Sequence, residues 1–130
     1  MEGPLRKLGV FSFYFLKGEK MNSKIIAVDF DVTLCSNCYP YLGFANHMLI
    51  DYLKMQRKAG AKLILWTCRS GALLEEAVLW CKDKGLMFDA VNENLPEIIE
   101  TFGSDTRKIF ANEYIDDLAT SKFKLPFERP

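Results

Sequence analysis

Short apolar runs alternate with amphipathic stretches along most of the chain. Two runs rich in Ile, Val and Leu, at 24–29 and 62–67, have the composition of strands that are buried on both faces of a sheet. Between them, apolar residues recur at helical spacing over 44–59, and Gly60 stands where a helix C-cap is expected. This part of the chain therefore predicts a strand, a helix and a second strand.

The second half of the chain repeats this alternation. A second helix, capped by Ser70, is predicted to end before Gly85. A weaker strand is predicted at 87–91, and a short helix over 96–102 has a proline at its start and a glycine after its end. A final apolar stretch over 108–117 ends in two acidic residues. Strands that alternate with helices in this way indicate a mainly parallel sheet.

The fold class follows from this order of elements. It is α/β, a three-layer, Rossmann-like arrangement with right-handed crossovers, in which the carboxyl ends of all strands meet at one edge of the sheet. The 130 residues, 49% of them hydrophobic, suit one domain, which we place at 21–130. Ligands of open α/β sheets bind at that edge. Asp29, Thr67 and Asp117 are therefore predicted to be neighbours.

Residues 1–20 are predicted to be an N-terminal extension outside this domain. Two basic residues and the apolar run 8–16 imitate a signal peptide, but charged residues at 17–20 stand where small residues should mark a cleavage site. The codons for 17–20 can form a purine-rich run that resembles a bacterial ribosome-binding site ahead of Met21. We therefore expect either that translation starts at Met21 or that the extension is not essential. An intact mass that retains Met1 in the native protein would contradict the first expectation.

Composition narrows the partners and the compartment. Seventeen basic and seventeen acidic residues cancel, so nucleic acid is not an expected partner. No apolar stretch reaches the about 20 residues of a membrane-spanning helix, so no membrane contact is expected. Four cysteines without a repeating framework are typical of a reducing compartment, which predicts a cytoplasmic protein. Cys35 and Cys38 have CxxC spacing but lack the second pair that a zinc site needs.

Acidic residues gather at two predicted strand ends. Asp29 and Asp31 follow the first strand, and Asp116 and Asp117 follow the last. Brought to one edge, these carboxylates would repel one another strongly without a cation. Mg²⁺ prefers one or two carboxylates together with water and phosphate, which fits an open strand-end site better than a closed calcium cage does. The pattern predicts Mg²⁺ as cofactor and a small phosphorylated substrate as ligand.

The same residues resemble the motifs of the haloacid dehalogenase superfamily. The run Asp29-Phe-Asp-Val-Thr33 resembles the first motif, Thr67 the second, and Asp116-Asp117 the fourth, in the right order. The resemblance covers about 24–119 and implies a phosphatase that works through an aspartyl-phosphate. It implies that Asp29 is the nucleophile and Asp31 the general acid and base.

The resemblance also implies the metal ligands. They would be Asp29, the backbone carbonyl of Asp31 and an acid of the fourth motif. Asp117 is favoured over Asp116, because related proteins with Gly-Asp at this point align their acid with the second position. Asp116 would support Asp117 or share the metal. Thr33 is interpreted as a turn residue.

Phosphate binding is predicted around the second motif. The Thr67 hydroxyl and the backbone N–H groups of Cys68 and Arg69 would hold the phosphoryl oxygens. The third motif is a lysine that pairs with the nucleophile and the phosphate, and Lys108 is the candidate because its surroundings resemble those in deoxyribonucleotidases. A straight strand from Lys108 to Asp116, at about 3.3 Å per residue, would leave its amine roughly 26 Å away, so the chain must break between them. Arg69 is the alternative cation and a candidate substrate clamp.

Three further polar or aromatic residues lie inside or just after predicted strands. Asn92 and Asn94 follow a predicted strand end, where asparagine is either a substrate contact or a turn residue. Trp66, inside the second predicted strand, is expected in the core.

The substrate class depends on the length of chain between the first two motifs. The helix predicted at 44–59, together with the strand predicted from 62, takes most of the segment between Thr33 and Thr67, so a large cap domain of the kind many superfamily members carry does not fit. We expect a nucleotide or another small phosphomonoester, with a macromolecular substrate as the alternative. A catalytically silent phosphate- or metal-binding regulatory module on the same fold is the competing class.

Overall fold

A computed structural model describes residues 24–119. The predicted N-terminal extension, the proposed start at Met21 and the tail beyond residue 119 lie outside the described residues. At the centre is a four-stranded, wholly parallel sheet with the order β3-β2-β1-β4. The strands are β1 (Ile25–Val28), β2 (Lys62–Leu65), β3 (Ala90–Val91) and β4 (Glu113–Ile115). The predicted α/β, Rossmann-like fold with a parallel sheet is confirmed.

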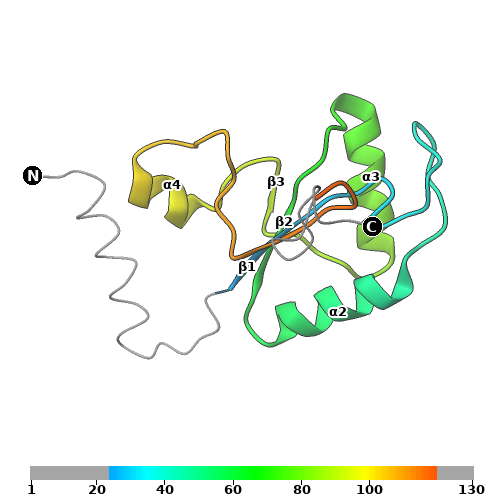
Figure 1. Ribbon diagram of the computed structural model, residues 1–130, viewed down its shortest axis with the longest axis horizontal. Coiled ribbons are helices and arrows are strands. Elements are labelled where there is room, and N and C mark those ends of the chain that lie inside the picture. The colour runs from blue at the N-terminus through cyan, green and yellow to red at the C-terminus, as the bar shows by residue number, and fades with distance from the viewer. Residues whose placement is uncertain (1–23, 120–130) are drawn as a thin grey trace, which may run out of the picture.

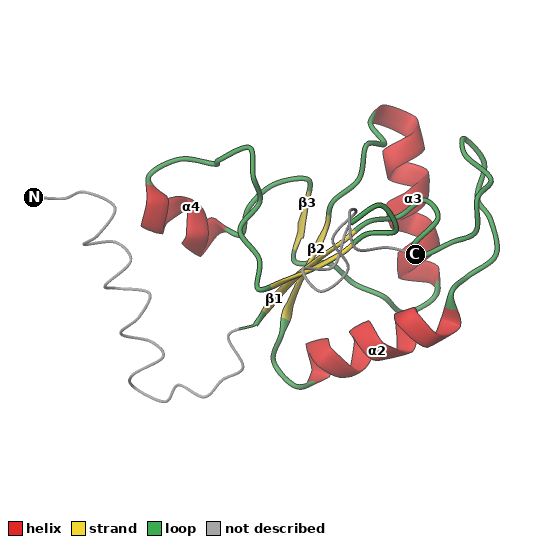
Figure 2. Ribbon diagram, viewed as in Figure 1, coloured by secondary structure: helices red, strands yellow, loops and turns green. Residues whose placement is uncertain are grey.

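Helices lie on both sides of this sheet, as Figures 1 and 2 show. The helices α2 (His47–Lys58) and α3 (Gly71–Asp83) cover one face, and the short helix α4 (Pro96–Phe102) lies on the other. The side chains of β1 alternate between two hydrophobic clusters, with Ile26 and Val28 in one and Ile25 and Ala27 in the other. A strand that contributes to both clusters is buried on both faces, which explains its continuous apolar run.

Helix α2 and strand β3 both begin later than the pattern predicts, and in each case a polar side chain explains the boundary. Helix α2 begins at His47 because Asn46 caps it, accepting a hydrogen bond from the Leu49 N–H at 3.2 Å. Strand β3 begins only at Ala90. The carboxylate of Asp89 accepts the Leu63 N–H at 2.8 Å, so a side chain takes the place of a strand carbonyl.

Trp66 corrects another expectation. Its side chain was predicted in the core, but the residue follows the last residue of β2 and is 37% exposed. Its ring lies 5.7 Å from that of Tyr114, centroid to centroid.

All four cysteines are free, Cys35 and Cys81 buried and Cys38 and Cys68 exposed. Among residues 24–119, no helix is long and apolar enough to cross a membrane.

The order of the elements brings the sequence motifs to one edge of the sheet. The N–H of Asp29 donates to the Ile115 carbonyl at 2.9 Å, which sets the residue after β1 beside the end of β4. The N–H of Trp66 donates to the Val28 carbonyl at 2.9 Å, which sets the end of β2 beside the same place. The acidic residues after β1 and β4 and the second motif after β2 therefore meet at the carboxyl edge.

Candidate functional site

Three carboxylates converge at the carboxyl edge of the sheet. One oxygen from each of Asp29, Asp116 and Asp117 lies within 4.8 Å of the others. Asp29 is partly buried at the end of β1, whereas Asp116 and Asp117 are exposed after β4. The predicted neighbourhood of these acids is therefore present, although they come from opposite ends of the domain sequence.

Thr33 joins two of these acids. Its hydroxyl lies 3.2 Å from Asp29 Oδ2 and 3.4 Å from Asp117 Oδ1, and it accepts the Asp117 N–H at 3.1 Å. The residue is only 8% exposed and stands in the turn after β1, as expected. Its role in holding the acids was missed, because a threonine in a turn carries no sequence signal for a distant partner.

The surroundings of Asp29 make its carboxylate hard to ionise. Burial raises the pKa of Asp29 to about 6, and the negative charges of Asp116 and then Asp117 contribute to the increase. Hydrogen bonds from the Phe30 backbone and the Thr33 side chain oppose this effect without cancelling it. Mutually repelling, hard oxygen donors around a shared space are a suitable ligand set for a divalent cation such as Mg²⁺.

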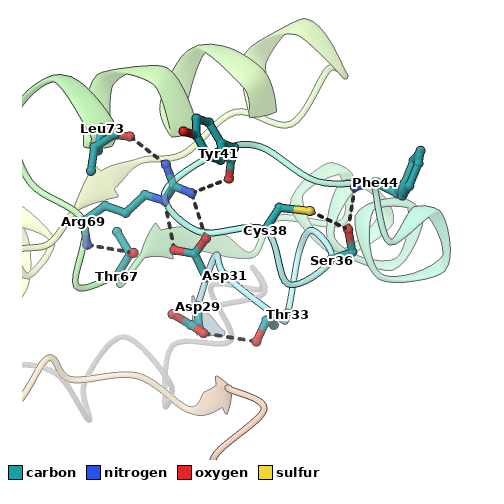
Figure 3. A network of polar contacts seen from close by, with 10 residues as sticks. All are labelled: Asp29, Asp31, Thr33, Ser36, Cys38, Tyr41, Phe44, Thr67, Arg69 and Leu73. Carbon is teal, nitrogen blue, oxygen red and sulfur yellow. Dashed lines mark hydrogen bonds and ion pairs between the residues drawn. The ribbon is translucent and has the colours of Figure 1, made fainter.

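Asp31 has opposite surroundings, although it stands only two residues away. Arg69 donates to both of its oxygens, from Nε to Oδ2 at 2.9 Å and from a terminal nitrogen to Oδ1 at 2.8 Å. Figure 3 shows this pair beside Asp29 and Thr33, with the guanidinium turned toward Asp31. The Asp31 side chain is 22% exposed, so it still reaches the surface of the site.

The loop that follows β2 is organised by Asn92. The Asn92 Oδ1 accepts the Thr67 N–H at 2.8 Å, and the Arg69 N–H donates to the Thr67 hydroxyl oxygen at 3.1 Å. Asn92 itself has a φ of 55°, a left-handed conformation that asparagine tolerates better than most residues. Among residues 24–119, the Cys68 N–H has no hydrogen-bond partner, so it remains available to a ligand together with the Thr67 hydroxyl proton.

The second asparagine serves the loop before β4. Asn94 is 1% exposed, and its amide bonds to Asp105, the Thr106 carbonyl and the Phe110 N–H. It is therefore a structural residue rather than a substrate contact.

Lys108 lies in the segment between α4 and β4. The chain is not one straight strand here, because β4 starts at Glu113 and the Tyr114 hydroxyl donates back to the Ile109 carbonyl at 2.6 Å. Lys108 is exposed and lines a cavity with Phe102, Phe110 and other residues of this segment. Within the described part of the chain, the Lys108 ammonium makes no ion pair, either with the three site acids or with another residue.

The chain is similar to one solved structure over most of its length. No known family model matches it, and no curated protein matches it. The similar structure is that of a conserved protein coded by a locus from Bacteroides thetaiotaomicron, with a TM-score of 0.67 and 38% sequence identity. The match covers 81% of this chain and 83% of that one. At this identity and coverage, the chain belongs to the same protein family as this Bacteroides thetaiotaomicron protein.

Proposed function

We propose that the protein is a Mg²⁺-dependent phosphomonoester hydrolase that forms an aspartyl-phosphate on Asp29. The observation that carries the proposal is the convergence of Asp29, Asp116 and Asp117 within 4.8 Å at the carboxyl edge of a parallel sheet. This edge is where open α/β folds bind ligands. A cluster of three acids is unfavourable there without a cation, and a carboxylate that attacks an anionic phosphate also needs a cation to offset their repulsion.

The donor set suits the metal. Asp29, Asp117 and Asp116 supply carboxylate oxygens, and the backbone carbonyl of Asp31 is a fourth candidate ligand. When bound, Mg²⁺ would neutralise these acids and polarise a phosphoryl oxygen of the substrate. Thr33 fixes the spacing between Asp29 and Asp117 through its hydroxyl.

The chemistry divides between the two acids of the first motif. The Asp29 carboxylate attacks phosphorus, and the bond between phosphorus and the leaving oxygen breaks as Asp31, which must be protonated when the cycle begins, gives that oxygen its proton. Water then attacks the phosphorus, Asp31 takes a proton from it, and the bond to Asp29 breaks to release inorganic phosphate. Each carboxylate oxygen of Asp31 has a second lone pair beside the one that Arg69 occupies, so proton transfer is sterically open.

The phosphoryl group needs further donors. In the described residues, the Thr67 hydroxyl and the Cys68 N–H are two uncommitted donors of the loop after β2. Lys108 is proposed as the third-motif lysine because of its place in the sequence, and this role requires its flexible side chain to reach the phosphate.

The proposed substrate is a small phosphomonoester such as a nucleotide, and the proposed location is the cytoplasm. Between Thr33 and Thr67 the described chain contains helix α2, strand β2 and loops but no additional domain, so this segment supplies no large cap for the carboxyl edge. The free cysteines are compatible with a reducing compartment.

A substrate panel tests the proposal. The full chain is assayed with Mg²⁺ against an aryl phosphate and nucleoside 3′- and 5′-monophosphates, with chelator and Asp29→Asn as negative controls. The exposed helix residue Asp51 offers a matched control, because Asp51→Asn removes a carboxylate from α2 and should leave turnover unchanged.

The competing function has its own outcome. If Mg²⁺ raises the melting temperature of the wild type but not of Asp29→Asn, while no phosphomonoester is hydrolysed, the protein is a silent metal-binding module and the enzyme proposal fails.

A further inference from the structure

Arg69 is the most deeply enclosed charged side chain of the site. The residue is 2% exposed and its side chain 0% exposed, although it lies next to the exposed Cys68. Buried charges are costly unless they are paired and hydrogen-bonded. Such burial needs a specific set of partners, and the structure supplies one.

The guanidinium uses its planar fork on three different segments of the chain. Two N–H groups bind both oxygens of Asp31, a third contact is to the Tyr41 carbonyl at 3.0 Å, and a fourth is to the Leu73 carbonyl at 3.3 Å. These partners belong to the turn after β1, the loop before α2 and the first turn of α3. Arg69 is therefore a junction between the first motif and its surroundings.

Aromatic rings enclose the same guanidinium. The Phe30 ring lies 4.9 Å and the Tyr39 ring 5.2 Å from Arg69 Cζ, within the range of cation–π contacts. A guanidinium that is stacked, bonded and shielded in this way does not project into the site mouth to bind a phosphate.

The loop 36–43 has a closed base of its own. The Ser36 N–H donates to the Phe44 carbonyl at 2.8 Å, and the Phe44 N–H donates to the Ser36 hydroxyl at 2.7 Å. A side chain at Gly43 would collide with Ser36. With its base closed in this way, the loop makes its bonded contact to the site through Tyr41, whose carbonyl accepts from Arg69.

We propose that Arg69 is a positioning residue, which holds the Asp31 carboxylate in its reactive orientation and ties the loop 36–43 to it. This inference rests on the proposed function, in which Asp31 transfers the proton. It replaces the role of a substrate clamp, because the Arg69 side chain is 0% exposed and its guanidinium is already bonded to Asp31, Tyr41 and Leu73. Asp31 lies on a turn beside Val32, whose φ is 63°, and both of its carboxylate oxygens accept from Arg69, so these bonds fix the orientation of the side chain.

The first test separates positioning from substrate binding. Arg69→Lys keeps the charge but replaces the fork with a point donor. In steady-state assays with Mg²⁺ and an aryl phosphate, we expect kcat to fall about 100-fold, the usual cost of a small misplacement of a reacting group, while KM stays within about 3-fold. A large rise in KM with kcat nearly unchanged would show that Arg69 binds substrate and would overturn the proposal.

The chain offers a matched control. Arg57 makes a similar two-point pair with Asp89, at 3.0 and 3.4 Å, away from the site. Arg57→Lys should leave both kcat and KM unchanged. An equal loss of kcat in this control would mean that the effect of Arg69→Lys is a general loss of stability.

A double-mutant cycle shows whether Arg69 acts through Asp31. In an Asp31→Asn background, adding Arg69→Lys should change kcat by less than about 3-fold, because the group that it positions is already gone. If the two losses multiply in full, Arg69 acts independently of Asp31 and the proposal is wrong.

Hydrogen exchange supplies a readout that needs neither turnover nor the mutants of Asp31. In the full chain, Arg69→Lys should speed amide exchange in 36–43 and in the turn 30–34, with 47–58 unchanged. Unchanged exchange in both segments would disprove the link.

If Arg69→Lys does not fold, Tyr39→Leu removes one stacking ring and should give a smaller change of the same pattern. If the wild type hydrolyses no phosphomonoester, the proposed function fails, while the exchange still decides whether Arg69 ties the loop to Asp31.

Discussion

Asp29 and Asp31 are two residues apart, yet the fold gives them opposite electrostatic surroundings. Asp29 faces two further carboxylates, and its pKa is raised to about 6 by burial and by these neighbours. Asp31 faces a buried arginine that donates to both of its oxygens. The Asp29 carboxylate therefore needs a bound cation, whereas the Asp31 carboxylate already has the guanidinium of Arg69 as its counter-charge.

The proposed function would use this difference to let one turn serve two chemical tasks. A nucleophile that shares a metal benefits from an arrangement that is unfavourable until the metal arrives. A proton-transfer group instead needs a fixed position, which the planar fork of Arg69 supplies. The pKa of Arg69 is raised by its hydrogen bonds to Asp31, so the guanidinium keeps its charge.

The largest expected effect is on turnover when Asp29 is changed. Asp29→Asn removes the nucleophile while it preserves the shape of the side chain, so kcat should fall by about 10⁴-fold or more. Steady-state hydrolysis of an aryl phosphate with Mg²⁺ measures the loss. Retained turnover would show that Asp29 is not the nucleophile, and the comparison would then describe electrostatics without catalysis.

Changing Asp31 should cost both activity and stability. Asp31→Asn removes the proton-transfer group, with an expected loss of about 10³-fold in kcat. It also leaves the buried Arg69 without its counter-charge, which should lower the free energy of unfolding by about 3 kcal/mol. Urea unfolding measures this second effect. Asp89→Asn, at the more exposed pair with Arg57, should destabilise the protein less.

Lys108 tests whether Asp29, unlike Asp31, has no cation from the protein itself. If its ammonium pairs with Asp29 when phosphate is bound, Asp29 also gains a cation from the protein, and Lys108→Met should lower kcat/KM about 100-fold. Lys62→Met, at the exposed start of β2, is the control. A change of less than about 2-fold for Lys108→Met would mean that the metal alone supplies positive charge to Asp29.

The bridge made by Thr33 should affect metal binding more mildly. Thr33→Val keeps the shape of the side chain and removes the hydroxyl that joins Asp29 to Asp117. We expect Mg²⁺ to bind about 10-fold more weakly, as for other groups that orient metal ligands. We also expect the free energy of unfolding to fall by about 1 kcal/mol. Calorimetric titration with Mg²⁺ checks the first value, and an unchanged affinity would assign Thr33 to the turn alone.

The smallest effect is on the pH dependence of stability. Because the folded-state pKa of Asp29 is about 6 and its ordinary value is 3.8, its favourable contribution is present below about pH 4 and is lost as the pH rises through 6. Without Mg²⁺, Asp29→Asn should therefore melt about 2 °C higher than the wild type at pH 7.5, since Asp29 is partly exposed and solvent weakens the repulsion. The difference should vanish at pH 4. A lower melting temperature at pH 7.5 would contradict the idea that Asp29 is repelled by its neighbours.

The fold and the acidic edge could be predicted because their signals are local. Continuous apolar runs that end in acids predict strands buried on both faces, and parallel strands bring such ends together. The proximity of Asp29 to Asp116 and Asp117 follows from these two rules. The exact start of β3 could not be predicted from the same rules. At this point the Asp89 carboxylate, and not a strand carbonyl, accepts the Leu63 N–H.

The Arg69 junction was beyond the reach of sequence reasoning for a physical reason. Arginine is mostly exposed in proteins, so its burial is not the default expectation. Two of its partners are the carbonyls of Tyr41 and Leu73, which every residue type offers equally. The same holds for Asn92, whose amide oxygen binds the backbone of Thr67.

The conformation and the hydrogen bond of Asn92 restrict which residue types position 92 can accept among relatives of this protein. Its left-handed backbone and its bond to the Thr67 N–H place two separate demands on one position, and glycine satisfies only the first because it has no side-chain acceptor. In an alignment of relatives, position 92 should therefore accept few residue types. Because its partner is a backbone N–H, this demand does not depend on which side chains the loop 67–69 carries.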